Sequence, residues 1–449
     1  MPLCFFKKTT VEGSKKREKG CVFFSTVASF VERKLKNGGS FFLLNFIFKG
    51  ANVVISNKVN INRRHLMGNK ILIAILASLS LVTAAHAEEG MEGGEKKPFS
   101  VYGDLAVNAS FHDNEGNFAA RTPGFGNHDD FALALAEINF EKNWSSSQLH
   151  LGLGFGNTLA MINPTTLSKY GATGNSPALN LTNAYYKLNS SYGLSFKVGK
   201  FESPFGHETY NHMDNSQFTR SYGYMLSPWF QAGVGVNYTS GMFDVGLIVS
   251  NGSQSEGFDS NENNKAIGLT VAVNPMDNLA IDLGYLTSKE SADTNNDNTF
   301  AGDSELFSVT MTDISVAYMI NEMFDVAINY VSNEIQAKAT GSTSETANSI
   351  AIYGNANLGM YGLGLRYEQF SYDDGAAFSK ITYGNPGVAG KTENKISSIT
   401  LTGTADIDQN AKFVLEYRMD SSDEKIWTDK DNTATDGQNT ITAAVMYRF

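Results

Sequence analysis

The sequence predicts an all-β protein: a transmembrane, antiparallel, up-and-down β-barrel of about sixteen strands, with short periplasmic turns and long extracellular loops. Three observations predict this fold. Segments of alternating apolar and polar side chains follow one another from Phe99 to the C-terminus. Seven short turns alternate strictly with eight long loops that are rich in Asn, Asp, Ser and Gly. The chain ends on a strand whose last residue is Phe449, which suits a strand that closes a barrel in lipid.

The first strand sets the pattern for the others. Phe99, Val101, Leu105 and Val107 fall on one face of residues 99–111, because side chains in a strand alternate with period two. This length suits a tilted membrane crossing. The same pattern predicts strands over residues 99–111, 129–143, 146–158, 179–189, 193–204, 229–240, 243–251, 265–274, 278–289, 305–320, 323–335, 347–358, 361–372, 395–406, 411–421 and 438–449. Fourteen or eighteen strands stay open as alternatives if one hairpin is misassigned.

Apolar side chains recur on the face that would contact lipid. The row Phe324, Val326 and Ile328 is one example, and aromatic residues such as Trp229 recur near the strand ends, where a barrel wall meets the lipid headgroups. The strand over 129–143 departs from this pattern, and we expect a β-bulge in it.

The last strand carries a recognisable ending. Val445, Tyr447 and Phe449 alternate along it, which resembles the C-terminal assembly signal of bacterial outer-membrane β-barrel proteins. The resemblance implies three partners: the barrel assembly machinery, outer-membrane lipid and lipopolysaccharide. We expect residues 438–449 to pair with residues 99–111. The backbone N–H and C=O groups of an open sheet edge would find no water in lipid to hydrogen-bond with.

The N-terminal part contains a secretory signal at an unusual position. Residues 67–87 combine Lys70, an apolar run and the Ala85-His86-Ala87 motif, which predicts cleavage between Ala87 and Glu88. We expect residues 1–66 to be a non-native upstream extension, with a real cytosolic extension as the alternative. Residues 88–98 are then a short periplasmic segment, and residues 99–449 form the barrel.

The charge balance excludes one class of partner. Residues 1–87 carry 14 of the 35 Lys and Arg but 3 of the 46 Asp and Glu, which leaves the mature chain with 21 basic and 43 acidic side chains. Nucleic-acid binding relies on basic side chains that neutralise phosphates, so we expect no nucleic-acid partner. Both cysteines also precede residue 88, so the mature chain forms no disulfides.

The inward faces of the strands are polar and charged. A barrel of this width normally encloses water, so these side chains predict a channel. The expected pore-lining residues are Asp104, Lys197, Asp244, Asp282, Asp325, Arg366, Glu368, Lys412, Glu416 and Arg418. Acidic residues outnumber basic ones in this set, which favours a weak preference for cations. The alternative is that these charged side chains are merely solvated by the water in the barrel and that other residues set the selectivity.

The long segment after the fifth strand is the expected constriction. Residues 201–228 are rich in aromatic side chains and contain Glu208, Asp214 and Arg220. In general bacterial porins the loop at this position folds inward and narrows the pore, and this segment resembles it. The stretch GKFESPFGHE, residues 199–208, also resembles the OmpL-like porin family.

This resemblance implies a location and a function. It implies a porin in the outer membrane of a Gram-negative bacterium, which passes small hydrophilic solutes and ions by passive diffusion and assembles as a homotrimer. The usual porin cluster of several Arg facing acidic residues across the constriction is not visible in the segment 201–228.

Two motifs suggest metals without meeting the required spacing. His207-Glu208-x-x-x-His212 is one residue longer than the zinc motif H-E-x-x-H. Asp293-x-Asn295-x-Asp297 begins like a calcium loop, but Asn298 replaces its glycine. We expect no metal site and no cofactor, and leave open loose Ca²⁺ binding by the acidic loops, including Asp429 and Asp431.

Two other function classes stay as alternatives. An outer-membrane barrel enzyme of the lipase or protease type would need a compact catalytic cluster, for which His207, His212 and Ser216 are the candidates. No triad or pair of catalytic carboxylates can be placed, so we expect no enzyme activity. A surface adhesin or receptor would act through the acidic loops.

Overall fold

A computed structural model describes residues 99–113, 130–162, 179–253, 265–290, 307–337, 344–373, 393–429, 431 and 433–449. The predicted upstream extension (1–66), signal peptide (67–87) and periplasmic segment (88–98) lie outside these residues. Cleavage between Ala87 and Glu88 therefore stays a prediction.

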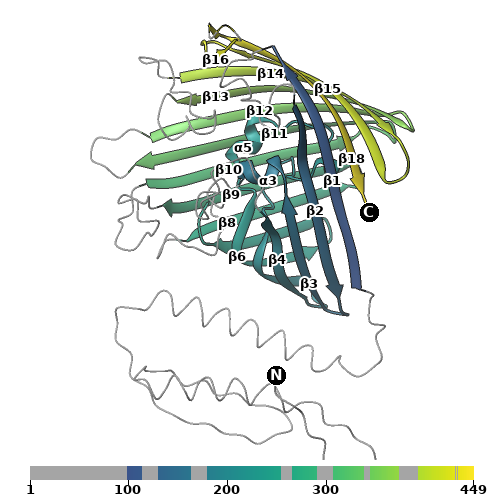
Figure 1. The fold of residues 1–449 in the computed structure, drawn as a ribbon. Coiled ribbons are helices and arrows are strands. Elements are labelled where there is room, and N and C mark those ends of the chain that lie inside the picture. Colours follow the sequence, from purple (N-terminus) through teal and green to yellow (C-terminus); the bar gives the residue numbers. More distant parts are fainter. Residues whose placement is uncertain are drawn as a thin grey trace, which may run out of the picture. The chain divides into compact units, whose positions relative to one another are not determined.

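Sixteen of the described strands form one closed antiparallel barrel, in which each strand pairs with the barrel strands before and after it in the sequence, and the last pairs with the first (Figure 1). The first eight barrel strands are β1 (Phe99–His112), β2 (Asp130–Asn143), β3 (Ser147–Phe155), β4 (Asn180–Asn189), β5 (Leu194–Glu202), β6 (Phe230–Ser240), β7 (Phe243–Ser250) and β8 (Ala266–Met276). The second eight are β9 (Leu279–Glu290), β10 (Phe307–Met319), β11 (Phe324–Ala337), β12 (Ser344–Asn357), β13 (Tyr361–Asp373), β14 (Glu393–Asp406), β15 (Ala411–Ser422) and β18 (Gly437–Arg448). The prediction of sixteen strands is confirmed.

The first and last strands close the barrel as expected. Val107 pairs with Val445 in the register between β1 and β18. The ladder ends at Gly103 and Phe449, whose backbone N–H groups donate to each other's carbonyl oxygens at 3.1 and 3.0 Å. The C-terminal residue therefore completes the backbone hydrogen bonding that removes the sheet edge.

Short turns join the strands in pairs at one end of the barrel. The turn between β6 and β7 contains Gly241 and the turn between β12 and β13 contains Gly359, both with positive φ (57° and 80°), a conformation that favours glycine. The long connections leave the other end. Two of them are described in large part: residues 203–229, named loop L3, and residues 423–436, named loop L8.

The predicted bulge in 129–143 is confirmed. The register between β1 and β2 shifts so that Ala106 faces Leu135 while Val107 faces Leu133, which leaves Ala134 as the extra residue.

The third strand ends earlier than predicted. The strand predicted over 146–158 ends at Phe155, because Gly156 takes a φ of 128° and turns the chain. A short helix, α3 (Asn157–Ile162), follows and buries Leu159.

The outward wall is apolar and exposed, as lipid contact requires. Phe324, Val326, Ile328 and Tyr330 are examples on β11. Trp229, predicted to belong to an aromatic girdle, is different: it is partly buried, and its Nε1 donates to the Tyr224 carbonyl of loop L3 at 3.0 Å. No helix among the described residues is long and apolar enough to cross a membrane.

Candidate functional site: the loop inside the barrel

Loop L3 runs through the interior of the barrel. It leaves β5 after Glu202, forms a short 3₁₀ helix, η2 (His212–Asp214), and a short α-helix, α5 (Tyr222–Leu226), and joins β6. Figure 1 shows α5 within the ring of strands, and α5 contacts β11, β12 and β13 on the wall opposite β5. The loop therefore crosses the lumen.

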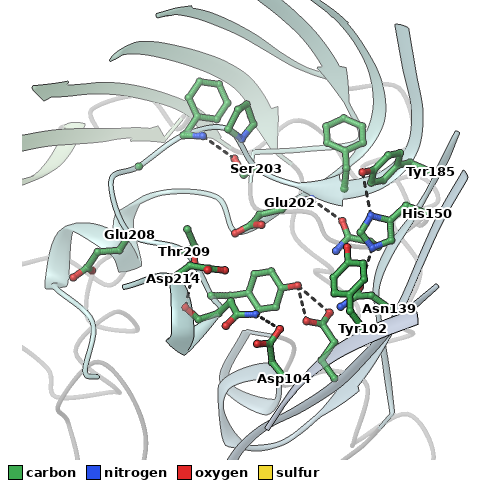
Figure 2. A pocket seen from close by; sticks show the side chains of 18 of the residues that line it. Tyr102, Asp104, Asn139, His150, Tyr185, Glu202, Ser203, Glu208, Thr209 and Asp214 are labelled. Carbon is green, nitrogen blue, oxygen red and sulfur yellow. Dashed lines mark hydrogen bonds between the residues drawn. The ribbon is translucent and has the colours of Figure 1, made fainter. Parts of the chain in front are cut away.

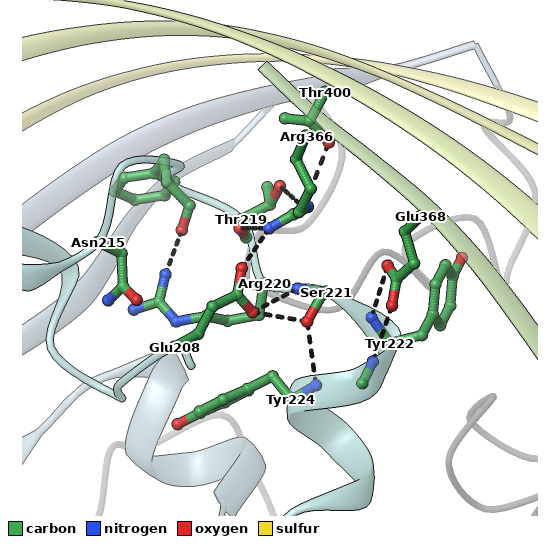
Figure 3. Close-up of polar contacts among 12 residues, drawn as sticks. Glu208, Asn215, Thr219, Arg220, Ser221, Tyr222, Tyr224, Arg366, Glu368 and Thr400 are labelled. Atoms are coloured by element: carbon green, nitrogen blue, oxygen red, sulfur yellow. Dashed lines mark hydrogen bonds and ion pairs between the residues drawn. The ribbon is translucent and has the colours of Figure 1, made fainter. Parts of the chain in front are cut away.

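A buried ion pair attaches the loop to β13. Arg366 donates from Nη1 to Glu208 Oε1 at 2.5 Å, and the side chains are 0% and 4% exposed (Figure 3). The same Arg366 nitrogen donates to the carbonyl of Thr219 at 2.8 Å, so one wall arginine holds two parts of the loop. Removing one partner of such a pair leaves a buried, uncompensated charge.

Two wall carboxylates bind backbone N–H groups of the loop. Glu416 on β15 accepts from the N–H groups of Phe218 and Thr219 at 2.7 and 3.0 Å. Glu368 on β13 accepts from those of Tyr222 and Gly223 at 2.9 and 2.8 Å. A carboxylate that accepts two backbone N–H groups satisfies donors that a buried loop would otherwise leave unpaired.

Two further arginines complete the network. Arg220 is fully buried, and its guanidinium donates to the carbonyls of Thr209, Tyr210 and Phe218 within the loop. Arg418 on β15 donates to the Arg220 carbonyl at 2.6 Å and pairs with Asp420 at 2.9 Å. The guanidinium groups thus hold the loop both internally and to the wall.

The electrostatics of the loop favour one protonation state. Burial alone would raise the pKa of the Glu208 carboxyl, but Arg366, Arg220 and the Ser221 hydrogen bonds hold it below its ordinary value. Burial, together with the charge of Arg220, holds the pKa of His212 well below its ordinary value. Near neutral pH, Glu208 is charged and His212 is neutral.

The first half of the loop contacts the strands where the barrel closes. Asn211 donates to Asp104 on β1 at 2.7 Å, and the Tyr210 hydroxyl donates to Glu137 on β2 at 2.9 Å. Arg448 of β18 pairs with Asp104 at 2.7 Å and with Asp214 of the loop at 2.8 Å. The penultimate residue of the chain therefore joins β1, β18 and loop L3.

Part of the lumen is filled with apolar side chains rather than water. Inward-facing Phe370, Ile396 and Val331 pack with Tyr222 of loop L3 in one buried cluster. Trp427, in the small β16 (Trp427–Thr428) and β17 (Ala434–Thr435) sheet of loop L8, joins this cluster and is 1% exposed. This differs from the expected polar interior, since both loops fold inward and bury the wall that they cover.

The structure separates the expected pore-lining residues into two groups. Arg366, Glu368, Glu416 and Arg418 are at most 1% exposed and hold the loop, which differs from the expectation that they face water. Asp104 is also buried. The remaining side chains are half-buried or exposed: Lys197, Asp244, Asp282, Asp325 and Lys412.

The expected constriction residues are separated in the same way. Glu208 and Arg220 are buried, whereas the Asp214 side chain is 47% exposed beside Arg448. Sequence reasoning missed the role of Arg448, whose inward position on the last strand was its only signal.

Three of the cavities lined by described residues lie in the lumen. The large cavity has a volume of about 560 Å³ and lies between β1–β5 and the first half of loop L3 (Figure 2). The small cavity, of about 240 Å³, lies along β4–β8 and shares Lys197, Phe201 and Glu202 with the large one. The third, of about 390 Å³, lies along β11–β15 and shares Asp214 with the large cavity. These shared residues make the cavities neighbours along one lumen.

The two histidines considered under the alternative enzyme hypothesis have separate partners. His207 hydrogen-bonds to Ser315 at 3.2 Å and packs at a tilt against the Tyr353 ring, whereas His212 hydrogen-bonds to Thr158 at 2.9 Å. Within the described residues, no group of three or more His, Cys, Asp or Glu could hold a metal ion.

The candidate calcium positions are placed only in part. Asp429 Oδ1 accepts from the backbone N–H groups of Asp431 and Thr433 at 3.0 and 2.7 Å. The motif at residues 293–297 lies outside the described residues.

Comparison with known families decides the identity. A family model described as beta-barrel porin-2, OmpL-like, matches residues 99–449, which span the whole barrel. The chain belongs to this porin family. It is an outer-membrane protein of Gram-negative bacteria whose barrel provides a channel for passive diffusion.

Solved structures agree with the porin fold. OmpT of Vibrio cholerae in its trimer form has a TM-score of 0.54 and 13% identity, over 78% of this porin and 99% of that chain. The anion-selective porin from Comamonas acidovorans has a TM-score of 0.52 and 11% identity, over 78% and 99%. DcaP of Acinetobacter baumannii has a TM-score of 0.52 and 11% identity, over 80% and 100%. A comparison with curated protein sequences found no match.

Proposed function

We propose that this porin passes small hydrophilic solutes with a weak preference for cations, through a lumen narrowed by a loop L3 that stays in place. The charge of the exposed lumen wall supports this preference. Asp244 on β7 and Asp282 on β9 lie at one level of the barrel, because both pair with Ala272 of the intervening strand. Two strand spacings separate them by roughly 10 Å.

These two carboxylates act on solutes because they face the lumen without a basic partner. Among the described residues, no salt bridge neutralises Asp244 or Asp282. The buried charges have partners of their own: Arg366 and Arg418 pair with Glu208 and Asp420. Glu368 and Glu416 accept from backbone N–H groups of the loop, so these buried groups contribute little to the field in the open lumen. Asp244 and Asp282 therefore favour cations, as rings of acidic side chains do in cation channels.

Planar-bilayer recording tests this function. We expect stable conductance steps from purified protein, and a reversal potential in a KCl gradient that shows K⁺ passing more readily than Cl⁻. The double variant Asp244→Asn/Asp282→Asn should reduce this preference because it removes both charges. The matched control is Asp408→Asn, in the turn between β14 and β15, which should leave the preference unchanged.

Two results would contradict the proposal. Without conductance steps the channel itself would be refuted, whereas Cl⁻ selectivity in the unaltered protein would refute only the cation preference.

We also propose a homotrimer, which the trimer form of Vibrio cholerae OmpT supports. Cross-linking of the detergent-solubilised protein should yield a species of three chains. Outer-membrane lipid and lipopolysaccharide suit the exposed apolar wall, and the barrel assembly machinery suits the exposed Tyr447 and Phe449 at the C-terminus. We propose no enzyme activity, because His207 and His212 are held by separate partners.

A further inference from the structure

Lys197 lies at the junction of two lumen cavities. It projects inward from β5 and lines both the large and the small cavity. Its ammonium nitrogen is 4.9 Å from the ring centroid of Tyr185 and 4.9 Å from that of Phe201. Both distances are within the range in which a cation is attracted to an aromatic face. Two rings therefore share one ammonium group.

The two rings are held in place without the lysine. The Tyr185 hydroxyl hydrogen-bonds to His150 at 3.1 Å and to Gln148 at 3.4 Å. Phe201 is buried and meets the Tyr185 ring edge-on, with centroids 6.5 Å apart and an interplanar angle of 87°. Because the rings do not depend on Lys197 for their position, they form a preorganised aromatic corner that can accept another cation.

A carboxyl group, whose oxygens can accept hydrogen bonds from an ammonium ion, also lies at this corner. Glu202 lines the same two cavities as Lys197, and Figure 2 shows its side chain pointing into the open centre of the large cavity. Among the described residues, no salt bridge joins Lys197 to a carboxylate. Glu202 thus faces the cavity while the lysine ammonium rests on the rings.

Lys197 lies opposite a second lysine in the barrel wall. Lys187 of β4 pairs directly with Lys197 in the strand register and lines the small cavity. Like charges at directly opposed positions repel each other. The Lys197 side chain is also long and flexible, so its ammonium can leave the rings while its backbone stays in the strand.

We propose that Tyr185, Phe201 and Glu202 form a binding site for small organic ammonium ions in the channel, which Lys197 occupies as a tethered competing cation. The inference rests on the proposed channel function and names a solute class for it. A primary amine carries the same ammonium group as Lys197, so the two compete for the same ring faces. Lys197 is then the residue that keeps such solutes from binding tightly during passage.

Single-channel recording with a diamine tests the site. Diaminobutane is added to one side of a bilayer that contains the purified protein, and butanediol serves as the uncharged probe of the same length. Lys197→Met keeps an unbranched side chain that is one atom shorter and removes the charge. We expect it to strengthen diaminobutane block by about ten-fold, as the gain of one cation–aromatic contact implies, and to leave butanediol without effect.

Matched variants separate the aromatic site from a general charge effect. Lys187→Met removes the same charge from the opposed position and should change diaminobutane block less than Lys197→Met does. In the Lys197→Met background, Tyr185→Phe removes the hydroxyl anchors but keeps the ring and its edge-on contact with Phe201, so it should retain most of the strong block, whereas Tyr185→Leu should abolish the gain. Normal conductance in amine-free solution shows that each variant is folded.

The outcomes distinguish this site from the channel itself. Equal block in the Lys197→Met and Lys187→Met variants would overturn the site, as would strong block that survives Tyr185→Leu. A protein that conducts normally but shows no stronger block in Lys197→Met refutes the ammonium site alone. Without any conductance the proposed function fails, and the inference fails with it.

Discussion

At the scale of single residues, the buried ion pair between Glu208 and Arg366 attaches loop L3 to the barrel wall. Both side chains are buried, and both make further hydrogen bonds to other parts of the loop. A buried charge that loses its partner costs more than the pair contributes when it is intact. The loop should therefore be sensitive to changes at either side chain.

The substitution Glu208→Gln tests this dependence. It keeps the size of the side chain but leaves the Arg366 charge uncompensated, so we expect the free energy of unfolding in lipid vesicles to fall by about 3 kcal/mol. Urea titration followed by tryptophan fluorescence measures it. Asp325→Asn is the control, because Asp325 is an exposed lumen carboxylate. Equal stability of the two variants would contradict the role of the pair.

Arg448 shows how one residue can serve two parts of the structure. Its guanidinium binds Asp104 of the first strand and Asp214 of loop L3, while its backbone belongs to the closing strand. The Arg448 side chain is 39% exposed, so solvent screens both ion pairs and each contributes modestly to stability. Their main effect is on position, because they hold the charged Asp214 side chain of loop L3 beside the large cavity.

At the scale of elements, loop L3 behaves as a fixed part of the wall. It contacts strands on several sides of the barrel through carboxylates, arginines and buried aromatic rings. The protonation of these groups decides how firmly it is held.

Acid should loosen the loop. The pKa values of Glu208 and His212 are both lower in the docked loop than the ordinary values of 4.5 and 6.5. A released loop therefore binds protons that the docked loop does not, so docking is strongest above pH 6.5 and weakens as the pH falls. As the pH falls, His212 of a released loop begins to bind a proton below about pH 6.5, and Glu208 of a released loop does so below about pH 4.5.

Current noise in single-channel recordings measures this loosening. We expect open-channel current to be steady at neutral pH, and fluctuations to grow as the pH falls below 6. His212→Gln cannot titrate, so its fluctuations should begin only at lower pH. If this variant and the unaltered protein begin to fluctuate at the same pH, His212 is not the group that responds.

At the scale of the whole molecule, closure of the barrel depends on contact between the two ends of the described chain. The Phe449 ring lies over Gly103 of β1. A Cβ atom built on Gly103 would lie 2.3 Å from the Glu137 carbonyl oxygen and 2.6 Å from Cζ of Phe449. A side chain at residue 103 would therefore displace the terminal ring or separate the first strands.

Gly103→Ala tests this closure. We expect a lower yield of folded barrel in the membrane, because either the Phe449 ring or the β1–β2 ladder must shift. The folded fraction is measured by the faster migration of unheated porin in gel electrophoresis. Gly354→Ala is the matched control, because a Cβ atom there meets nothing within 4 Å. Equal yields would show that the terminal contact is dispensable.

The strand pattern alone predicted the barrel, its strand number and the pairing of 438–449 with 99–111. Alternation decides which side chains face lipid, and loop length decides which strands form hairpins, so both are readable from local sequence. The same pattern indicated a bulge within 129–143, and the structure places the extra residue at Ala134. Residues 199–208 also resemble the OmpL-like porins, the family whose model matches the whole barrel.

Only the tertiary structure decided which inward charges face water. Arg366 and Asp282 are both inward-facing residues of the wall, and the alternation of their strands does not distinguish them. One is buried beneath loop L3 and the other stays exposed, because the path of a 27-residue loop decides what it covers. The contacts of Lys197 with Tyr185 and Phe201 likewise depend on side-chain conformation. The sequence by itself determined the barrel, since strand alternation is local, whereas loop packing between distant residues decided the lumen.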